Sequence, residues 1–560
     1  MAESMLSKVA VRALVLKGKS DVKHMLNCAK NAKAVNEKLL FKILQDNKNS
    51  EYGKRYDFEN IHSIEDFRKK VPITEYADYQ DEITEFYQTN ENFKFSSNKV
   101  IGYAKSSGSI GVPKLIPKTD KDIAVYTRYT ATRFVALADD YLRKHGQGGL
   151  KPARGICLLA KDDSISPCGL PSSNVADVAE RKFEKLEPII MSLPMGRQFI
   201  RGEIDRNYAY ARFGLENEDC SYMFYVFAKG VAEFIEYIQT NWKSLVDEIE
   251  KGTLSQEVFM KDETRAVLNT KVKPNPKRAA ALRKEFEKGF DETILKRIWP
   301  NLSVISAIGT SALFDGFTQE IKRYSKGILM DYSIYGASEG LVAAAYESDN
   351  PGQVLLTDSC YMEFFKEDDE NAETIYGVDE LEKGQKYEIL ITNQSGFYRY
   401  RLKDVIEVLD FYEGCPVINF VYRKGQLLNA TGEKTNIEQM TEAVKRLGKV
   451  AGTKINEWAV MVEKGTNRYH YVLVAENESG KNLSIYAEDF DKILCDVNPS
   501  YKTDKDLLGT PIISNQKRGT HKEWEKYKAS KGAAESQIKP VRHLDTDEKK
   551  EFFLSRLEEN

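Results

Sequence analysis

The chain has 560 residues, of which 41% are apolar and 30% are charged, and its net charge is −3. This balance suits a soluble surface around a large core and argues against nucleic acid as the main partner. The seven Cys residues are scattered without a C-x-x-C pair, and no apolar run reaches the length of a membrane span. We therefore expect a cytoplasmic protein with reduced thiols, no membrane partner and a monomeric state.

The N-terminal part of the chain is predicted to alternate helices and strands. The N-terminus is basic, and Lys8 and Arg12 interrupt its apolar run, so we do not expect a secretory signal there. A helix is predicted over residues 31–46, where one face carries Val35, Leu39, Leu40, Ile43 and Leu44. Further helices are predicted over 121–142 and 223–250, and a buried strand is predicted over 153–160.

A loop rich in hydroxyls and glycine lies between two extended stretches: Ser106-Ser107-Gly108-Ser109-Ile110-Gly111-Val112-Pro113-Lys114. Its glycines let the backbone curl, its N–H and O–H donors suit a phosphate, and Lys114 adds a positive charge. The spacing fits neither G-x-x-x-x-G-K-[ST] nor G-x-G-x-x-G. The loop resembles the phosphate loop of adenylate-forming enzymes, [ST]-S-G-[ST]-[ST]-G-x-P-K, with Ile110 replacing one hydroxyl. A simple Ser/Gly turn between strands is the alternative.

Strand signals cluster from residue 302 onward. Residues 302–308 lead into Gly309-Thr310-Ser311, residues 327–334 lead into Tyr335-Gly336, and a helix is predicted over 341–346. Strands, loops and helices in alternation indicate an α/β protein, in which ligands bind at the carboxyl ends of the strands.

A change of pattern at Arg423-Lys424-Gly425 predicts a domain boundary. We expect a large N-terminal domain over 1–422, with β-sheets flanked by helices, and a smaller α+β C-terminal domain over 423–560. The last strands before the boundary are predicted over 387–392, 398–409 and 417–422. After it we predict helices over 435–447, 485–494 and 522–531, a hairpin of strands over 457–462 and 469–474, and a strand over 512–514.

The segment Tyr335-Gly336-Ala337-Ser338-Glu339-Gly340 supports two incompatible interpretations. It contains G-x-S-x-G, the pattern of a hydrolase nucleophile elbow, which would make Ser338 a nucleophile and a later His its base. Alternatively, the Glu339 carboxylate could hold Mg²⁺, which prefers one or two protein carboxylates together with phosphate oxygens. Tyr335 would then stack on a purine. An ordinary turn is the third possibility.

Two further positions stand out. Asp404 follows Tyr398-Arg399-Tyr400-Arg401 at the end of a predicted strand, and its carboxylate could accept both hydroxyls of a ribose. A surface ion pair is the alternative there. Near the C-terminus, Lys539 precedes Pro540 after a predicted helix; alone, such a lysine is normally solvated.

Together these segments resemble the GH3 family of acyl acid–amido synthetases, a branch of the adenylate-forming, firefly-luciferase-like superfamily. The resemblance runs over most of the chain. It includes the Leu39–Pro72 pattern, the loop at 106–114 and the Tyr335–Glu339 motif. It also includes Tyr398–Asp404, Phe420–Lys424, Lys434-Thr435 and the closing Gly519–Arg542 pattern.

The resemblance implies an ATP-dependent ligase that activates a small carboxylic acid as an acyl-adenylate and transfers it to an amine, usually an amino acid. It implies ATP and Mg²⁺ as cofactors, with Glu339 on the metal and Arg133 on the acyl carboxylate. It implies catalytic roles for Ser338, at the α-phosphate, and for Lys434 and Lys539, from a mobile C-terminal domain. Nucleotide contacts are implied for Ser106, Ser107, Gly108, Ser109, Lys114, Gly309, Thr310, Tyr335, Asp404 and Arg423.

Two departures from the family pattern keep a further alternative open. Ile110 removes a loop hydroxyl, and Lys403 replaces a small residue next to Asp404. A non-catalytic nucleotide-binding protein on the same fold is therefore the alternative beside the serine hydrolase, because a fold does not guarantee its chemistry.

Overall fold

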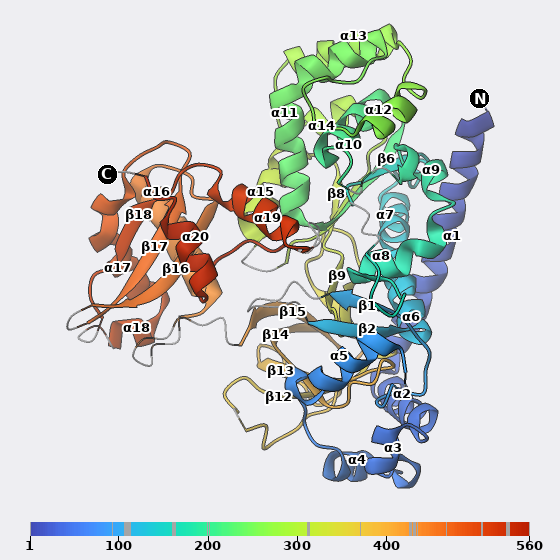
Figure 1. Ribbon diagram of the computed structural model, residues 1–560, viewed down its shortest axis with the longest axis vertical. Helices are drawn as coiled ribbons and strands as arrows, with labels where there is room; N and C mark the ends of the chain where they lie inside the picture. Colours follow the sequence, from blue (N-terminus) through green and yellow to red (C-terminus); the bar gives the residue numbers. More distant parts are fainter. Residues whose placement is uncertain are drawn as a thin grey trace.

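The computed structural model describes residues 2–91, 93–105, 114–159, 164–198, 200, 202–310, 314–369, 371–424, 428, 430, 433, 435–465, 468–503, 505, 508–533 and 538–558. A larger N-terminal part ends with β15 (Cys415–Arg423), and a smaller C-terminal part begins with α16 (Ile437–Ala451) (Figure 1). The predicted α/β class, with a smaller α+β part at the C-terminus, is confirmed.

A four-stranded parallel sheet lies at the centre of the upper half of the N-terminal part. Its order is β3-β6-β7-β8, with bounds Arg154–Cys157, Cys220–Phe227, Val304–Ile308 and Leu329–Asp331. Helix α11 (Ala228–Lys251) begins directly after β6 and ends at Gly252, whose φ of 67° is a conformation that glycine adopts without strain. The apolar stripe of α11 is buried in the core, as its period predicts.

A seven-stranded antiparallel sheet forms the lower half. Its order is β12-β13-β14-β15-β11-β10-β9. The strands other than β15 are β9 (Ile334–Ala337), β10 (Gly340–Ala345), β11 (Gln353–Leu355), β12 (Tyr361–Lys366), β13 (Lys386–Thr392) and β14 (Tyr400–Tyr412). A small sheet of order β2-β1-β4 combines Leu115–Thr119, Val100–Lys105 and Ser172–Ser173. Strand β5 (Pro194–Arg197) precedes α10.

Helices cover these sheets. Those before β3 are α1 (Ala2–Lys30), α2 (Ala32–Asn47), α3 (Glu51–Arg55), α4 (Ile64–Lys70), α5 (Gln80–Thr89), α6 (Asp120–Thr130) and α7 (Arg133–Lys144). Those after it are α8 (Val175–Glu180), α9 (Glu187–Ile190), α10 (Arg206–Glu216), α12 (Asp262–Asn269), α13 (Pro276–Glu287), α14 (Ile294–Ile298) and α15 (Asp315–Tyr324).

Four sequence expectations about these elements were wrong. The helix expected over 223–250 begins only at Ala228, because residues 223–227 belong to strand β6. Residues 121–142 form two helices, α6 and α7. The stretch expected as one strand over 327–334 is divided between β8 and β9, which belong to different sheets. Ser333 lies between them with a φ of 59°, and its N–H donates to Asp331, so the chain turns from one sheet to the other there. The apolar run 341–346 was expected as a helix, but residues 341–345 belong to the buried strand β10. A short apolar run fits either structure.

The C-terminal part is a three-stranded sheet with helices. Its order is β16-β17-β18, with bounds Glu457–Lys464, Tyr469–Glu476 and Ile512–Asn515, and β16 and β17 form the predicted antiparallel pair. The helices that follow α16 are α17 (Ala487–Val497), α18 (Pro499–Thr503), α19 (Thr520–Ser530) and α20 (Asp547–Leu554). Asn436 and Gln439 form a capping box at the start of α16.

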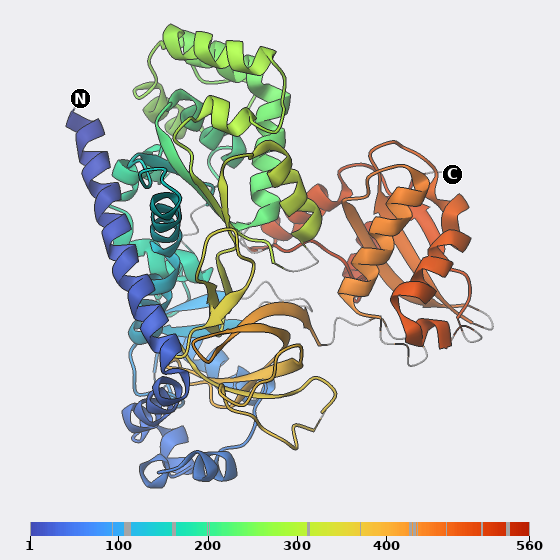
Figure 2. The same ribbon diagram turned by 180° about the vertical axis from the view of Figure 1, so that it is seen from behind.

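Ion pairs join the two parts where α19 lies next to α11 (Figures 1 and 2). Lys229 of α11 is 2.8 Å from Glu457 of β16 and also contacts Glu525 of α19. Glu457 accepts a further hydrogen bond from Arg542 at 3.0 Å. The Lys229 side chain is only 5% exposed, so this contact is buried, whereas the pair of Lys522 with Glu236 is more than half exposed.

Candidate active site

A paired carboxylate forms one side of the site. Asp404 on β14 is buried, and both of its oxygens face Arg423, whose Nε lies 2.5 Å from Oδ1 and whose Nη2 lies 3.0 Å from Oδ2. Tyr335 donates its hydroxyl to Oδ2 at 2.9 Å. The Asp404 charge raises the pKa of Arg423, while burial, followed by Asp404, raises the pKa of Tyr335. The Asp404 carboxylate, which the sequence suggested as the ribose contact, is thus held at a fixed position.

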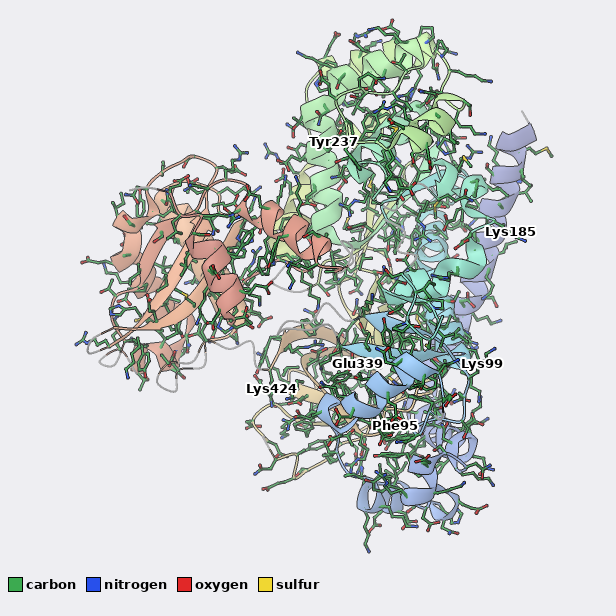
Figure 3. The ribbon with its side chains drawn as sticks, in the orientation of Figure 1. Phe95, Lys99, Lys185, Tyr237, Glu339 and Lys424 are labelled. Atoms are coloured by element: carbon green, nitrogen blue, oxygen red, sulfur yellow. The ribbon has the colours of Figure 1, made fainter. Side chains whose placement is uncertain are left out.

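A second carboxylate lies in the turn between β9 and β10. Glu339, which is labelled in Figure 3, is buried, and its Oε1 accepts a hydrogen bond from the Tyr400 hydroxyl at 3.0 Å. Its backbone carbonyl accepts from Asn393 at 2.7 Å, which fixes the turn. Within the described part of the chain, no hydrogen bond engages Oε2. A carboxylate oxygen of this kind fits a Mg²⁺ ligand.

Lys114 reaches the same carboxylate through Tyr400. Its Nζ lies 3.2 Å from the Tyr400 hydroxyl and 5.1 Å from the centre of the Tyr76 ring. Burial lowers the Lys114 pKa, and the Arg423 and Lys403 cations lower it further, against the opposing effect of Glu339. The loop from Ser106 to Pro113 lies outside the described residues, but Lys105 pairs with Leu115 across β1 and β2, so its two ends are adjacent.

Lys539 approaches these groups from the C-terminal part of the chain. It keeps an exposed surface, but the protein atoms around its ammonium lower the pKa to about 8. The nearby Arg423 cation lowers it too, while Asp404 and Glu339 raise it. Lys539 therefore lies within electrostatic range of both carboxylates. One region of the structure thus contains three cations and two carboxylates: Lys114, Arg423, Lys539, Glu339 and Asp404. The excess of positive charge suits a polyphosphate anion.

Gly309 lies at the carboxyl end of β7, where the sequence placed an adenine contact. A Cβ at this position would come within 2.7 Å of the Thr318 hydroxyl, which itself donates to the Gly309 carbonyl at 3.3 Å. Glycine is therefore needed for this close approach. Thr310 follows it and is half-buried.

Ser338 does not lie in a hydrolase elbow. An elbow requires a strand, a sharp turn and a helix, whereas Ser338 lies in a hairpin turn in which Ala337 pairs with Gly340. Two of the downstream histidines have other environments, since His470 contacts the Thr510 carbonyl and His521 packs on Phe553. Among the described residues, Ser338 has neither the setting of a nucleophile nor a hydrogen bond to a histidine.

Arg133 has a structural role instead of the expected contact with an acyl carboxylate. It is 2% exposed, and it forms a two-point ion pair with Asp331 at 2.9 and 3.0 Å. It also donates to the carbonyls of Ala345 and Ser333. These bonds join α7 to both sheets and engage both terminal nitrogens of the guanidinium, while its buried Nε has no hydrogen-bond partner among the described residues. Lys434 lies outside the described residues.

The sequence interpretation missed Tyr400, although the residue was part of a quoted motif. Its hydroxyl connects Lys114 with Glu339, and burial followed by the Glu339 charge raises its pKa. Nothing in a local pattern distinguishes a tyrosine that bridges two distant groups from one that only packs.

Comparisons with known proteins agree with this fold. The GH3 family N-terminal domain matches residues 21–330, the central domain matches 353–423, and the C-terminal domain matches 438–548. The chain belongs to the GH3 family. With this membership, the enzyme class expected from the sequence, a ligase that forms carbon–nitrogen bonds, is confirmed.

Several relatives are similar over most of their length. An indole-3-acetic acid-amido synthetase GH3.2 of Arabidopsis thaliana is 27% identical over 479 residues, covering 81% of this chain and 86% of the relative. A 4-substituted benzoates-glutamate ligase GH3.12 of the same plant is 23% identical over 468 residues, covering 81% and 80%. The solved structure of the GH3.15 acyl acid amido synthetase superposes with a TM-score of 0.83 at 22% identity, covering 97% of each chain. That similarity concerns the fold.

Proposed function

We propose that this protein activates a small carboxylic acid with ATP to form an acyl-adenylate and releases pyrophosphate. In a second step it transfers the acyl group to an amine, in the first place the amine of an amino acid, and releases AMP. The chemical need is plain: a carboxylate is a poor electrophile, and adenylation supplies a leaving group. The observation that carries the proposal is the convergence of Lys114, Glu339, Asp404 and Arg423 with Lys539, which comes from the other part of the chain.

Each group has a proposed task. Asp404, held by Arg423, would accept the ribose hydroxyls, and Tyr335, buried against Phe420, would form a side of the adenine site with Gly309 and Thr310. Lys114 and the preceding loop would hold the outer phosphates. Lys539 would stabilise the charge that develops on the α-phosphate, which is the largest contribution such a site can make.

Glu339 is the residue proposed to hold Mg²⁺, and the bound ion would neutralise phosphate charge. The C-terminal part from residue 423 on is proposed to be mobile, so that Lys539 and Lys434 contribute to one step and withdraw for the other. A cytoplasmic monomer stays a prediction from the sequence. None of the helices in the described ranges combines the length and the apolar character that a bilayer crossing requires.

The test is a screen of carboxylic acids for ATP–pyrophosphate exchange, followed by amide formation with amino acids. Exchange that depends on an acid, with an amide as the final product, supports the proposal. ATP binding without exchange over a broad panel of acids would instead favour a non-catalytic nucleotide-binding protein.

A further inference from the structure

A cavity of about 1000 Å³ lies between α11 and the C-terminal part of the chain. One wall is the carboxyl end of β6 and the start of α11, an edge at which α/β proteins bind ligands. The opposite wall is α19 together with Ile538 and Pro540, the two neighbours of Lys539. The cavity therefore reaches the two chain neighbours of Lys539 and also includes Tyr237 of α11, which is labelled in Figure 3.

Most charged groups on the walls of the cavity already have partners. Lys229 contacts Glu525, Lys522 pairs with Glu236 at 2.9 Å, and Asp177 pairs with Arg197 at 3.2 Å. Glu233 on α11 differs from these groups, since its carboxylate is 16% exposed and its nearest ion-pair partner, Lys229, is 4.0 Å away. No hydrogen bond to the Glu233 carboxylate occurs among the described residues.

The environment of Glu233 favours a group that changes protonation near neutral pH. Burial, together with the charge of Glu525 of α19, raises its pKa, which lies at about 7. Lys229 on the same helix, Arg206 of α10 and Lys522 of α19 act in the opposite direction. A proton acceptor works best when its pKa lies near the working pH.

We propose that Glu233 holds the amino group of the acceptor substrate in this cavity and takes a proton from it before amide formation. The inference rests on the proposed function, because it assigns the acceptor site of that reaction. The basic side chains of Arg206 and Lys526 line the same cavity, so it offers a partner for the carboxylate of an amino acid as well as for its amine.

The ammonium of the acceptor gives one proton to the Glu233 carboxylate, which becomes a carboxylic acid. The freed nitrogen lone pair forms the C–N bond to the acyl carbon, the bond from that carbon to the phosphate oxygen of AMP breaks, and AMP leaves with the electron pair. The second nitrogen proton passes to solvent, and Glu233 returns its own proton to solvent after product release.

The experiment compares Glu233→Gln with wild type in two reactions that share the same acyl-adenylate, using an acid identified in the exchange screen. The first reaction uses an amino acid acceptor. The second uses hydroxylamine, which is neutral at pH 7 and needs neither an anionic partner nor a proton acceptor. The matched control is Asp247→Asn, which changes an acid to its amide on the same helix but pairs with Arg283 away from the cavity.

We expect Glu233→Gln to reduce kcat/KM for the amino acid about 100-fold, the loss typical of a missing proton acceptor. Pyrophosphate exchange and hydroxamate formation should match wild type and Asp247→Asn. In wild type, amide formation should rise with pH through about 7 and then level off, because the carboxylate form of Glu233 has accumulated, whereas Glu233→Gln should follow only the free amine of the acceptor, without an inflection near 7.

Unchanged amide formation in Glu233→Gln, or equal losses with both acceptors, would overturn the inference. If Glu233→Gln loses pyrophosphate exchange, Glu233→Asp provides the second measurement, and loss of exchange there too would also overturn it. Absence of acid-dependent exchange in wild type is a different result, since it would remove the proposed function itself.

Discussion

Asp404 and Arg423 lie directly opposite each other in the register of β14 and β15, and their side chains form a two-point ion pair. The strand pairing therefore fixes the carboxylate before any nucleotide is present. Such preorganisation reduces the ordering cost of binding.

Asp404→Asn is expected to weaken ATP binding about 10- to 100-fold, because hydrogen bonds that involve a charged group contribute roughly 1.5–3 kcal/mol each. The affinity can be measured by calorimetry on the folded variant. Asp410→Asn is the matched control, because it removes an exposed carboxylate from the same strand, where it pairs with Lys383. Equal ATP affinity of Asp404→Asn and wild type would contradict the ribose role.

Lys539→Ala is expected to slow acid-dependent pyrophosphate exchange by about 10²–10³, the usual effect of losing one group that stabilises transition-state charge. ATP affinity should change far less. Lys531→Ala, which removes an exposed lysine after α19, should leave exchange unchanged. A Lys539→Ala enzyme with the wild-type exchange rate would remove this lysine from the mechanism.

The lowered Lys539 pKa can be detected without any turnover. As the pH rises through about 8, Lys539 should lose its proton, whereas an ordinary lysine keeps its proton until about 10.4. At pH 8 an amine-acylating reagent should therefore modify Lys539 ahead of the other exposed lysines, as measured by mass spectrometry. Bound ATP should protect it, both by contact and by favouring the ammonium. Modification no faster than that of Lys531 would be inconsistent with this environment.

Lys403 occupies a backbone conformation that favours glycine, with a φ of 63°, which accounts for the small residue expected there. We predict that Lys403→Gly is more stable than Lys403→Ala by about 1 kcal/mol, since only glycine avoids the left-handed strain. Both changes remove the exposed ion pair with Glu75. The difference between the two variants in the free energy of unfolding, measured with denaturant, therefore reports the backbone strain alone. Equal stability of the two variants would contradict this explanation.

Ser338 should not react with a fluorophosphonate, because it lies in a hairpin turn without a histidine partner among the described residues. Labelling is read by mass spectrometry of the intact protein, with a known serine hydrolase as the positive control. Covalent modification at Ser338 would reopen the hydrolase interpretation.

Elements with long, regular patterns could be predicted from the sequence. The stripe on α11 and the hairpin of β16 and β17 are local features, and both are present. The run 341–346 was assigned wrongly because six apolar residues carry no period that separates a buried strand from a buried helix. The break at Ser333 was missed because it depends on Asp331 and on two different sheets.

The candidate site was predicted where a motif carries its own chemistry, as for Glu339, Asp404 and Lys114. It was not predicted where the chemistry depends on distant neighbours. Arg133 was assigned to a substrate because no pattern reveals that Asp331, far along the chain, occupies it. Glu233 has no motif at all, and its setting depends on α10, α11 and α19 together.

The ion pairs between the two parts of the chain differ in burial, so we expect them to respond differently to ionic strength. Dissolved ions screen charges that they can approach, so added salt should weaken the exposed pair of Lys522 with Glu236. The pair of Lys229 with Glu457 is nearly closed to solvent and should persist. High salt would then weaken the exposed pair of Lys522 with Glu236 but not the buried pair of Lys229 with Glu457. The contact between the two parts of the chain should therefore tolerate a wide range of ionic conditions.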